Sequence, residues 1–250
     1  MMTFRMTKWC CLWSCLILAL MTGAGLSSAK AGDTDAFHAA VGSAYGHFRE
    51  SAFYARRGNA MTAAIELETF VDKWRAVEAT YAAKPPAAYA KDREWRQTLA
   101  RIGKRAQSGL KLIDDGETKK ARAMVMPIRS LLSELRRRNK MVTFSDCVDE
   151  ANAAFKKLFH FRRNLPDFGN AAQIEDLKSR LKTTIDAYKT CHDKAPPKVA
   201  VDPQFQRLMK DSLYYLDRMW IAIREKNQLN VVNILRRVVS SDDILWLRFG

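Results

Sequence analysis

The chain has 250 residues, of which 48% are hydrophobic and 28% charged, and its formal net charge at pH 7 is +15. It contains no Gly-rich phosphate loop, no Gly-x-Ser-x-Gly nucleophile motif and no His-Glu-x-x-His zinc motif. The sequence gives no support to the enzyme classes that these motifs define, and we expect a non-enzymatic protein.

The N-terminal segment has the pattern of a secretory signal peptide. Basic residues precede an almost wholly apolar segment, residues 9–20, and Ala29-Lys30-Ala31 places small residues at the A-x-A positions of a cleavage site. The apolar segment is shorter than the roughly 20 residues that a membrane-spanning helix needs; an uncleaved N-terminal anchor is the alternative interpretation. We predict a signal peptide over residues 1–31, cleavage near Ala31 and a periplasmic location.

The predicted mature chain is strongly basic. The signal peptide carries three basic residues and no acidic residue, so its removal lowers the net charge from +15 to about +12. The anions of an envelope compartment are lipid headgroups, lipopolysaccharide phosphates and acidic polymers, whereas nucleic acid is not an expected partner. We expect an anionic ligand or an envelope protein as the partner, and peripheral contact with a membrane surface is compatible with the same charge.

After the signal peptide, apolar residues recur every three or four positions, which is the period of an amphipathic helix. No segment shows the alternating pattern of a β-strand, so the sequence predicts an all-α fold. Pro127 falls inside one predicted helix and predicts a kink there. The predicted helices are 34–56, 60–82, 89–115, 117–139, 143–164, 170–193, 202–226 and 228–247.

Several sequence features recur at a spacing of about 111 residues. Gly58-Asn59-Ala60 recurs as Gly169-Asn170-Ala171, and Pro85-Pro86 recurs as Pro196-Pro197. Glycine can take the left-handed conformation that ends a helix, asparagine can cap the next helix, and consecutive prolines require an extended connection. The same features therefore punctuate both halves of the chain.

Further pairs support this repeat. Gly116 and Asn227 suit tight turns at matching places, and at an offset of 110 Trp95 corresponds to Phe205. Four antiparallel helices with one longer connection form a four-helix bundle. We predict that an internal duplication produced two tandem bundles, residues 32–141 and 142–250. One continuous helical array with a shared core is the alternative.

Two cysteines follow the signal peptide, Cys147 and Cys191. An even number of cysteines in an oxidising compartment indicates a disulfide. Cys147 falls at the start of one predicted helix and Cys191 at the end of the next, and antiparallel packing brings these ends together. We predict a disulfide between them; two free thiols or a metal-binding pair are the alternatives.

Arginines follow a seven-residue spacing in the predicted helix 117–139. Arg122, Arg129 and Arg136 share one face, and Arg137 extends it toward the boundary between the repeats. Arginine binds carboxylate and phosphate groups through paired hydrogen bonds. We interpret these four residues as a candidate anion-binding face, with a solvated helix face as the alternative.

No metal site is predicted from the histidines. Each lacks a His or Cys three or four positions away on the same helix, which metal-binding helices usually supply. His192, beside Cys191, is a weak metal-ligand candidate. Asp242 and Asp243 in the last predicted helix are expected to face solvent. The four histidines are His38, His47, His160 and His192.

The second repeat carries a succession of motifs that is similar to a known bundle. A helix begins with Ala171-Ala172-Gln173-Ile174-Glu175-Asp176-Leu177, and Ala195-Pro196-Pro197-Lys198, an Asp-containing loop and a long third helix follow. This order resembles the second and third helices of the cytochrome b562 and cytochrome c′ type of four-helix bundle. The resemblance implies a haem protein that transfers electrons or senses a ligand.

The ligands that this resemblance implies are not at the family's positions. A cytochrome b562-like protein uses a Met on its first helix and a His near the end of its last, but the predicted helix 228–247 has neither His nor Met. The Cys-x-x-Cys-His motif of a cytochrome c′-like protein has only a partial match in Tyr188-Lys189-Thr190-Cys191-His192. We predict no bound cofactor, and a haem or metal protein with atypical ligands is the alternative function.

Overall fold

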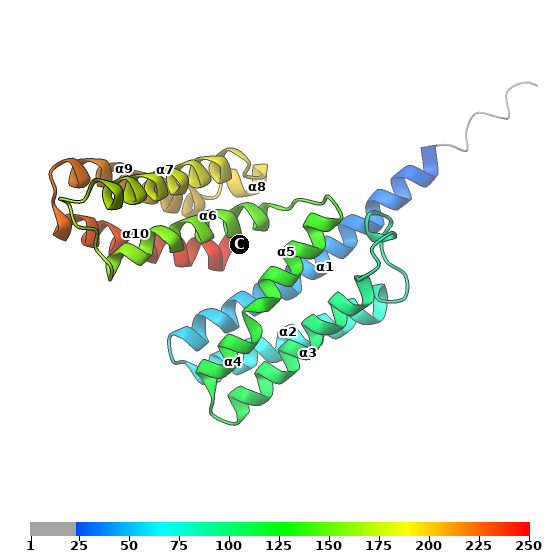
Figure 1. Cartoon of the computed structure of the whole chain (residues 1–250). Helices are drawn as coiled ribbons and strands as arrows, with labels where there is room; N and C mark the ends of the chain where they lie inside the picture. Colours follow the sequence, from blue (N-terminus) through cyan, green and yellow to red (C-terminus); the bar gives the residue numbers. More distant parts are fainter. Residues whose placement is uncertain (1–23) are drawn as a thin grey trace, which may run out of the picture.

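The computed structural model describes residues 24–250, and within this range the chain is helical with no β-strand, which confirms the predicted all-α fold. The helices form two groups (Figure 1). The first helical group contains α1 (Ala24–Arg56), α2 (Ala60–Tyr81), the 3₁₀ helix η1 (Ala87–Tyr89), α3 (Trp95–Asp114), α4 (Thr118–Val125) and α5 (Pro127–Arg138). The second helical group contains α6 (Phe144–Phe159), the 3₁₀ helix η2 (His160–Arg162), α7 (Ala171–Asp193), α8 (Pro197–Ala200), α9 (Pro203–Arg224) and α10 (Gln228–Phe249).

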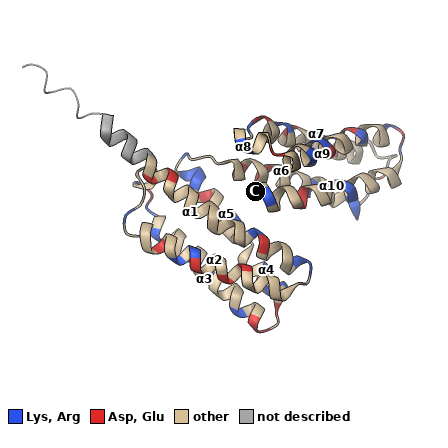
Figure 2. Ribbon diagram, turned by 180° about the vertical axis from the view of Figure 1, so that it is seen from behind, with Lys and Arg blue, Asp and Glu red and all other residues tan. Residues whose placement is uncertain are grey.

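The long helices of each group pack side by side. In the first group α2 contacts α1 and α3, α3 also contacts α4 and α5, and α1 contacts α4. In the second group α6 contacts α7 and α10, and α9 contacts the same two helices. Basic and acidic residues are distributed over both groups (Figure 2).

Side-chain caps begin several helices as the sequence predicts. The Asn59 side chain accepts a hydrogen bond from the Thr62 N–H at 3.1 Å, and Asn170 accepts from the N–H of Ala172 at 3.1 Å. These bonds satisfy backbone donors that have no partner inside the helix. The predicted starts near residues 60 and 170 are therefore confirmed, each with its local cause.

Two glycines take the left-handed conformation, but only one of them belongs to the recurring Gly-Asn-Ala motif. Gly58 has φ +79° after α1, and Gly116 has φ +78° after α3. The prediction of a left-handed Gly169 is wrong. That residue follows an irregular loop rather than the end of a helix, and its N–H donates to the Asp167 carboxylate at 2.8 Å.

The turn between α9 and α10 also differs from the expectation. Lys226, not Asn227, takes the left-handed conformation, with φ +54°. Asn227 instead caps α10 by accepting a hydrogen bond from the Asn230 N–H at 3.0 Å. The tight turn is present at the predicted place, and the asparagine acts as a cap within it.

Two of the predicted helices differ from the expected ranges. The predicted helix 117–139 is divided into α4 and α5 at Pro127, because proline has no N–H to continue the hydrogen-bond ladder. The helix predicted from residue 89 begins at Trp95 instead. The residues after Pro86 form η1, and the Asp92 carboxylate then accepts from the Glu94 N–H at 2.9 Å.

The apolar core continues from one helical group into the other. The buried side chains of both groups form one connected cluster. Phe48 of α1 meets Trp246 of α10 edge to face, with ring centroids 6.2 Å apart, and both side chains are buried. The two groups are therefore packed against each other at an apolar contact between α1 and α10.

The predicted signal peptide lies mainly outside the described residues, which begin at residue 24, so its processing stays a prediction. Within the described part of the chain, no helix has both the length and the apolar character required to cross a membrane.

Candidate ligand-binding cavity between the helical groups

Two of the predicted anion-binding arginines join the helical groups to each other. Arg136 of α5 donates from Nε at 2.8 Å and from Nη2 at 2.6 Å to the Asp146 carboxylate of α6. Arg129 of α5 forms an ion pair with Asp149 of α6, at 2.6 Å between Nε and Oδ1. The Arg129 and Arg136 side chains are only 12% and 9% exposed. The expectation that they form a solvent-facing surface is therefore wrong.

Arg129 enters a polar network inside the second helical group. Its Nη1 donates to the Asn152 side-chain oxygen at 2.8 Å, and its guanidinium lies over the Trp246 ring at 5.3 Å. Asn152 donates in turn to the Asp242 carboxylate, which also accepts from the Tyr188 hydroxyl at 2.5 Å. One arginine of the first group is thus connected to α6, α7 and α10 of the second.

Burial governs the ionisation of the carboxylates in this network. Burial raises the pKa of Asp149 to about 6, although the nearby Arg129 lowers it. Burial likewise raises the pKa of Asp242 to about 6. The expectation that Asp242 faces solvent is wrong, and Asp243 pairs with Arg56 of α1 across the junction. Of these two neighbouring residues of α10, Asp242 therefore faces the interior of the second group and Asp243 faces the first group.

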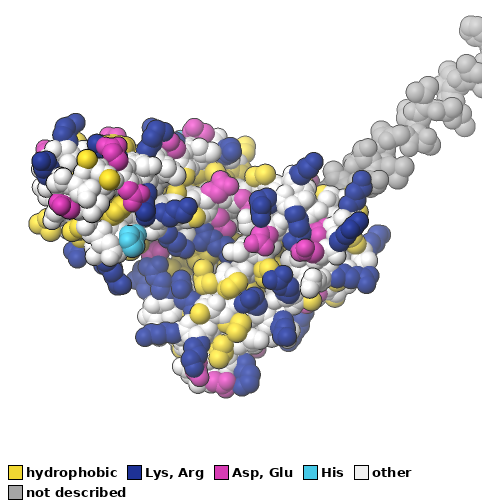
Figure 3. Space-filling model, in the orientation of Figure 1, with side chains coloured by type: hydrophobic (Ala, Val, Ile, Leu, Met, Phe, Trp, Pro, Cys, Tyr) yellow, Lys and Arg dark blue, Asp and Glu magenta, His cyan; other side chains and the backbone are white. Residues whose placement is uncertain are grey.

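The remaining predicted arginines do not complete an anion site with these two. Arg122 of α4 is half-buried and donates from Nε to the Ala52 carbonyl at 3.2 Å. Arg137 is exposed beside a groove between α5 and α6 that is lined by carboxylates as well as by cations. Figure 3 shows Lys and Arg side chains gathered where the two groups meet, with acidic side chains among them. The structure does not bring the four arginines together around one open space.

The predicted disulfide partners are close but unbonded. Cys147 lies in the first turn of α6 and Cys191 in the last turn of α7, and both are buried free thiols. Burial raises the pKa of both thiols, and each thiol also affects the pKa of the other. The predicted meeting of the two helix ends is present, while the covalent bond stays a prediction.

The weak metal candidate His192 is engaged with an aromatic ring. Its imidazole stacks on Phe205, with centroids 6.3 Å apart and planes 7° from parallel. Among residues 24–250, no three or more His, Cys, Asp or Glu side chains gather in a way that could hold a metal ion.

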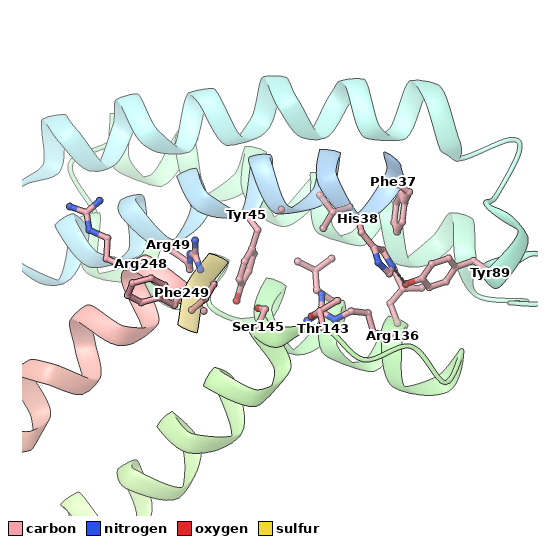
Figure 4. A pocket seen from close by; sticks show the side chains of 16 residues that line it. Phe37, His38, Tyr45, Arg49, Tyr89, Arg136, Thr143, Ser145, Arg248 and Phe249 are labelled. Atoms are coloured by element: carbon pink, nitrogen blue, oxygen red, sulfur yellow. Dashed lines mark hydrogen bonds between the residues drawn. The ribbon is translucent and has the colours of Figure 1, made fainter. Parts of the chain in front are cut away.

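A cavity of about 270 Å³ lies where the two helical groups meet (Figure 4). Its walls come from α1, η1 and α5 of the first group and from the start of α6, from α8 and from the end of α10 in the second. Most of the side chains that line it are apolar or aromatic, and no described Asp or Glu is among them. A concave, largely apolar space with a few polar groups is the usual form of a small-molecule site.

One end of this cavity holds polar groups without partners. Tyr45 and Arg49 of α1 and Ser145 of α6 border the same space in Figure 4. The Tyr45 hydroxyl, the Arg49 Nε and the Ser145 hydroxyl are buried and have no hydrogen-bond partner among the described residues. Tyr45 is only 5% exposed. Most buried polar groups in native proteins are hydrogen-bonded, so three unpaired donors in one cavity require an explanation.

Arg49 is the unpaired cation of the cavity. It makes no ion pair with any residue of the described range, and its guanidinium lies 5.5 Å from the centroid of the Tyr45 ring. Burial lowers the pKa of Arg49, although the nearby charges of Asp149 and Glu50 oppose this shift. The Arg49 side chain is half-buried, and its Nε is fully buried without a partner. A charged group that loses part of its hydration and gains no counter-charge is costly.

The other end of the cavity has its polar groups satisfied. His38 Nε2 and the Tyr89 hydroxyl share a hydrogen bond of 2.7 Å, and Arg136 is held by Asp146. Burial, and then the charge of Arg136, lower the pKa of His38. The neighbouring Phe37 ring packs against Tyr89, with centroids 5.3 Å apart. This end is aromatic, and burial disfavours the protonated form of its histidine.

The sequence analysis missed the residues at the polar end of the cavity. Arg49 follows Tyr45 by four positions and Phe48 by one, so a cation lies beside the apolar stripe of the first helix. The position of this arginine beside apolar residues is the sequence feature that could have indicated a half-buried cation. No protein-family model matches the chain, and no curated protein or solved structure is significantly similar to it.

Proposed function

We propose that the protein is a non-enzymatic binding protein and that a small anionic ligand occupies the cavity between its helical groups. The observation that carries the proposal is Arg49, which is half-buried, forms no ion pair with a described residue and has a buried Nε without a hydrogen-bond partner, in a cavity that no described carboxylate lines. A bound anion would supply the missing counter-charge, and arginine is well suited to hold carboxylate or phosphate oxygens. The periplasmic location expected from the N-terminal segment belongs to the same proposal.

We also propose that the two helical groups, residues 32–141 and 142–250, are copies of one four-helix bundle. The buried residues support this origin, because those of α3 recur in α9 at an offset of 110 and those of α4–α5 recur in α10 at the same offset. The pairs include Trp95 and Phe205, Leu99 and Met209, Ala106 and Leu216, Ile113 and Ile223, Val125 and Leu235, Ile128 and Val238, and Leu135 and Leu245.

The proline connections agree with the same offset. The Tyr89 N–H donates to the Pro86 carbonyl at 2.8 Å, and the Val199 N–H donates to the Pro196 carbonyl at 2.8 Å. Each turn is followed by an aspartate whose carboxylate accepts from the N–H two residues later: Asp92 from Glu94 at 2.9 Å and Asp202 from Gln204 at 2.8 Å. Equivalent hydrogen bonds 110 residues apart favour a copied unit over chance similarity in helix packing.

The helix contacts at the junction are those expected if an approximate two-fold axis related the two copies. The first helix of the first copy, α1, meets the last helix of the second copy, α10. Conversely, the last helix of the first copy, α5, meets the first helix of the second, α6, through Arg129–Asp149 and Arg136–Asp146. The cavity therefore lies between equivalent elements of the two copies, as ligand sites often do at domain interfaces.

A thermal-shift screen tests the proposed function. The purified protein is heated with small carboxylates, sulfonates and inorganic phosphate, each in turn. A ligand at 100 times its Kd stabilises a protein by about 2.7 kcal/mol, so an occupant of the cavity raises the Tm clearly. The shift should be lost in Arg49→Gln and kept in Arg57→Gln, which changes an exposed arginine after α1 that stacks on Phe53. If no anion gives a shift that depends on Arg49, the proposed function is wrong.

A further inference from the structure

We propose that the ligand is a monocarboxylate with one aromatic or branched apolar group, bound with its carboxylate against Arg49 and its apolar part toward Phe37 and Tyr89. This inference rests on the proposed function and specifies its ligand. It follows from the charges of the cavity, from the donors at its polar end and from its size.

The charges of the cavity wall can balance one negative charge on a ligand. Arg136 already holds Asp146 in a two-point interaction, and Arg248 lies 3.7 Å from the Glu50 carboxylate. His38 accepts or donates within its pair with Tyr89, and the positive charge of Arg136 disfavours its protonation. Arg49 is left as the one cation in the cavity wall without a counter-charge. A dianion would bring a second charge that the cavity does not balance.

The donors at the polar end match a carboxylate. A carboxylate offers two oxygens with about four lone-pair positions. The Arg49 guanidinium, the Tyr45 hydroxyl and the Ser145 hydroxyl come from two facing helices, and each has an unpaired polar atom. A phosphate monoester carries about −1.5 to −2 charges at pH 7, which exceeds what one arginine neutralises. The donor set therefore favours the monoanion.

The rest of the cavity requires an apolar body on the ligand. Val41, Leu132 and Leu135 line it, and the aromatic wall at Phe37 is made rigid by Trp95, whose ring centroid lies 5.0 Å away. A dry apolar cavity of about 150 Å³ is large enough to hold benzene. A space of about 270 Å³ accommodates one ring or branched group together with a short chain that bears the carboxylate.

Isothermal titration calorimetry of the purified protein with 3-phenylpropanoate tests this inference. The matched neutral probe is 3-phenylpropanamide, which keeps the shape and loses the charge. Succinate and inorganic phosphate are the dianionic probes. We expect 3-phenylpropanoate to bind with one-to-one stoichiometry and the amide to bind about 10- to 100-fold more weakly, as the loss of a charge-assisted hydrogen bond implies. Succinate and phosphate should bind more weakly than 3-phenylpropanoate.

Two pairs of variants assign the binding to the cavity. Arg49→Gln should remove the preference for the acid over the amide and should not lower the Tm, because Arg49 forms no ion pair with a described residue that the substitution would break. Arg57→Gln should keep the preference. Gly42→Leu should abolish binding without unfolding the protein, since a Cβ at Gly42 meets nothing within 4 Å and that residue lines the cavity. Gly46→Leu, on the same helix but outside the cavity lining, is the matched control.

The outcomes separate this inference from the proposed function. If succinate or phosphate binds more tightly than 3-phenylpropanoate and the binding depends on Arg49, the monocarboxylate is wrong and anion binding stands. If the amide binds as tightly as the acid, the role of Arg49 as carboxylate partner is wrong. If no probe, charged or neutral, depends on Arg49 or on Gly42, both proposals fail. Binding by Gly42→Leu as strong as by Gly46→Leu would place the ligand outside the cavity.

Discussion

At the scale of single residues, three arginines at the junction show how burial and pairing decide what a basic residue does. Arg129 and Arg136 are buried and paired with carboxylates of the second helical group, so they hold the protein together. Arg49 is half-buried nearby and its Nε has no hydrogen-bond partner among the described residues, so it is available to a ligand. The seven-residue spacing of Arg129 and Arg136 predicts that they share one face of a helix. It does not predict which other helix packs against that face.

The Arg136–Asp146 pair should contribute strongly to stability. Arg136→Gln leaves the Asp146 carboxylate, only 14% exposed, without its counter-charge. We expect a loss of about 3 kcal/mol in the free energy of unfolding, as for other broken buried pairs. Urea denaturation followed by circular dichroism measures this change.

The double variant Arg136→Gln with Asp146→Asn is the informative control. It removes the stranded charge, so we expect it to be more stable than Arg136→Gln alone. The expectation would be contradicted if the single variant lost less than about 1 kcal/mol, the range of an exposed ion pair.

At the scale of the elements, caps and prolines determine where helices begin and end, and side chains at those ends determine which helices meet. Asn59, Asn170 and Asn227 each cap a helix through local hydrogen bonds. Pro127 separates α4 from α5. These effects act over a few residues, which is why the sequence alone located most helix boundaries closely.

Oxidation of Cys147 and Cys191 should join α6 to α7. Both cysteines are free buried thiols, one in the first turn of α6 and the other in the last turn of α7, so bond formation needs an oxidant. The bond would close a loop of roughly 45 residues and stabilise the second helical group by about 3–4 kcal/mol in chain-entropy terms. Non-reducing peptide mapping of protein from an oxidising compartment should find the linked peptides.

The matched experiment compares oxidised and reduced protein with Cys147→Ser, which cannot form the bond. Reduction should lower the Tm of the wild type and leave that of the variant unchanged. Two free thiols in exported protein would contradict the prediction.

At the scale of the whole molecule, the junction makes stability depend on pH. Burial raises the pKa of Asp149 and Asp242 to about 6, above the ordinary value of 3.8. The folded protein therefore holds more protons than the unfolded chain between about pH 4 and 6, and the contribution of these two groups to stability falls as pH rises through that window. His38 acts in the opposite direction, because its pKa is lowered by burial.

Asp149→Asn should isolate this effect. Between pH 4 and pH 6 the free energy of unfolding of the wild type should fall, relative to that of the variant, by on the order of 2 kcal/mol. The variant lacks the titrating carboxyl group and should not show this fall. Urea denaturation at closely spaced pH values measures the difference, and Asp211→Asn, at an exposed site on α9, is the control. Parallel pH profiles of the wild type and Asp149→Asn would contradict the assignment.

The sequence by itself determined the all-α class, most helix boundaries and the meeting of Cys147 with Cys191, because periodicity, capping and proline geometry act locally along the chain. It did not determine which arginine would be left without a partner. That depended on contacts between distant segments, such as Arg136 with Asp146 and Phe48 with Trp246. Only the tertiary structure placed these residues together, because pairing and burial depend on which surfaces of separate helices face each other.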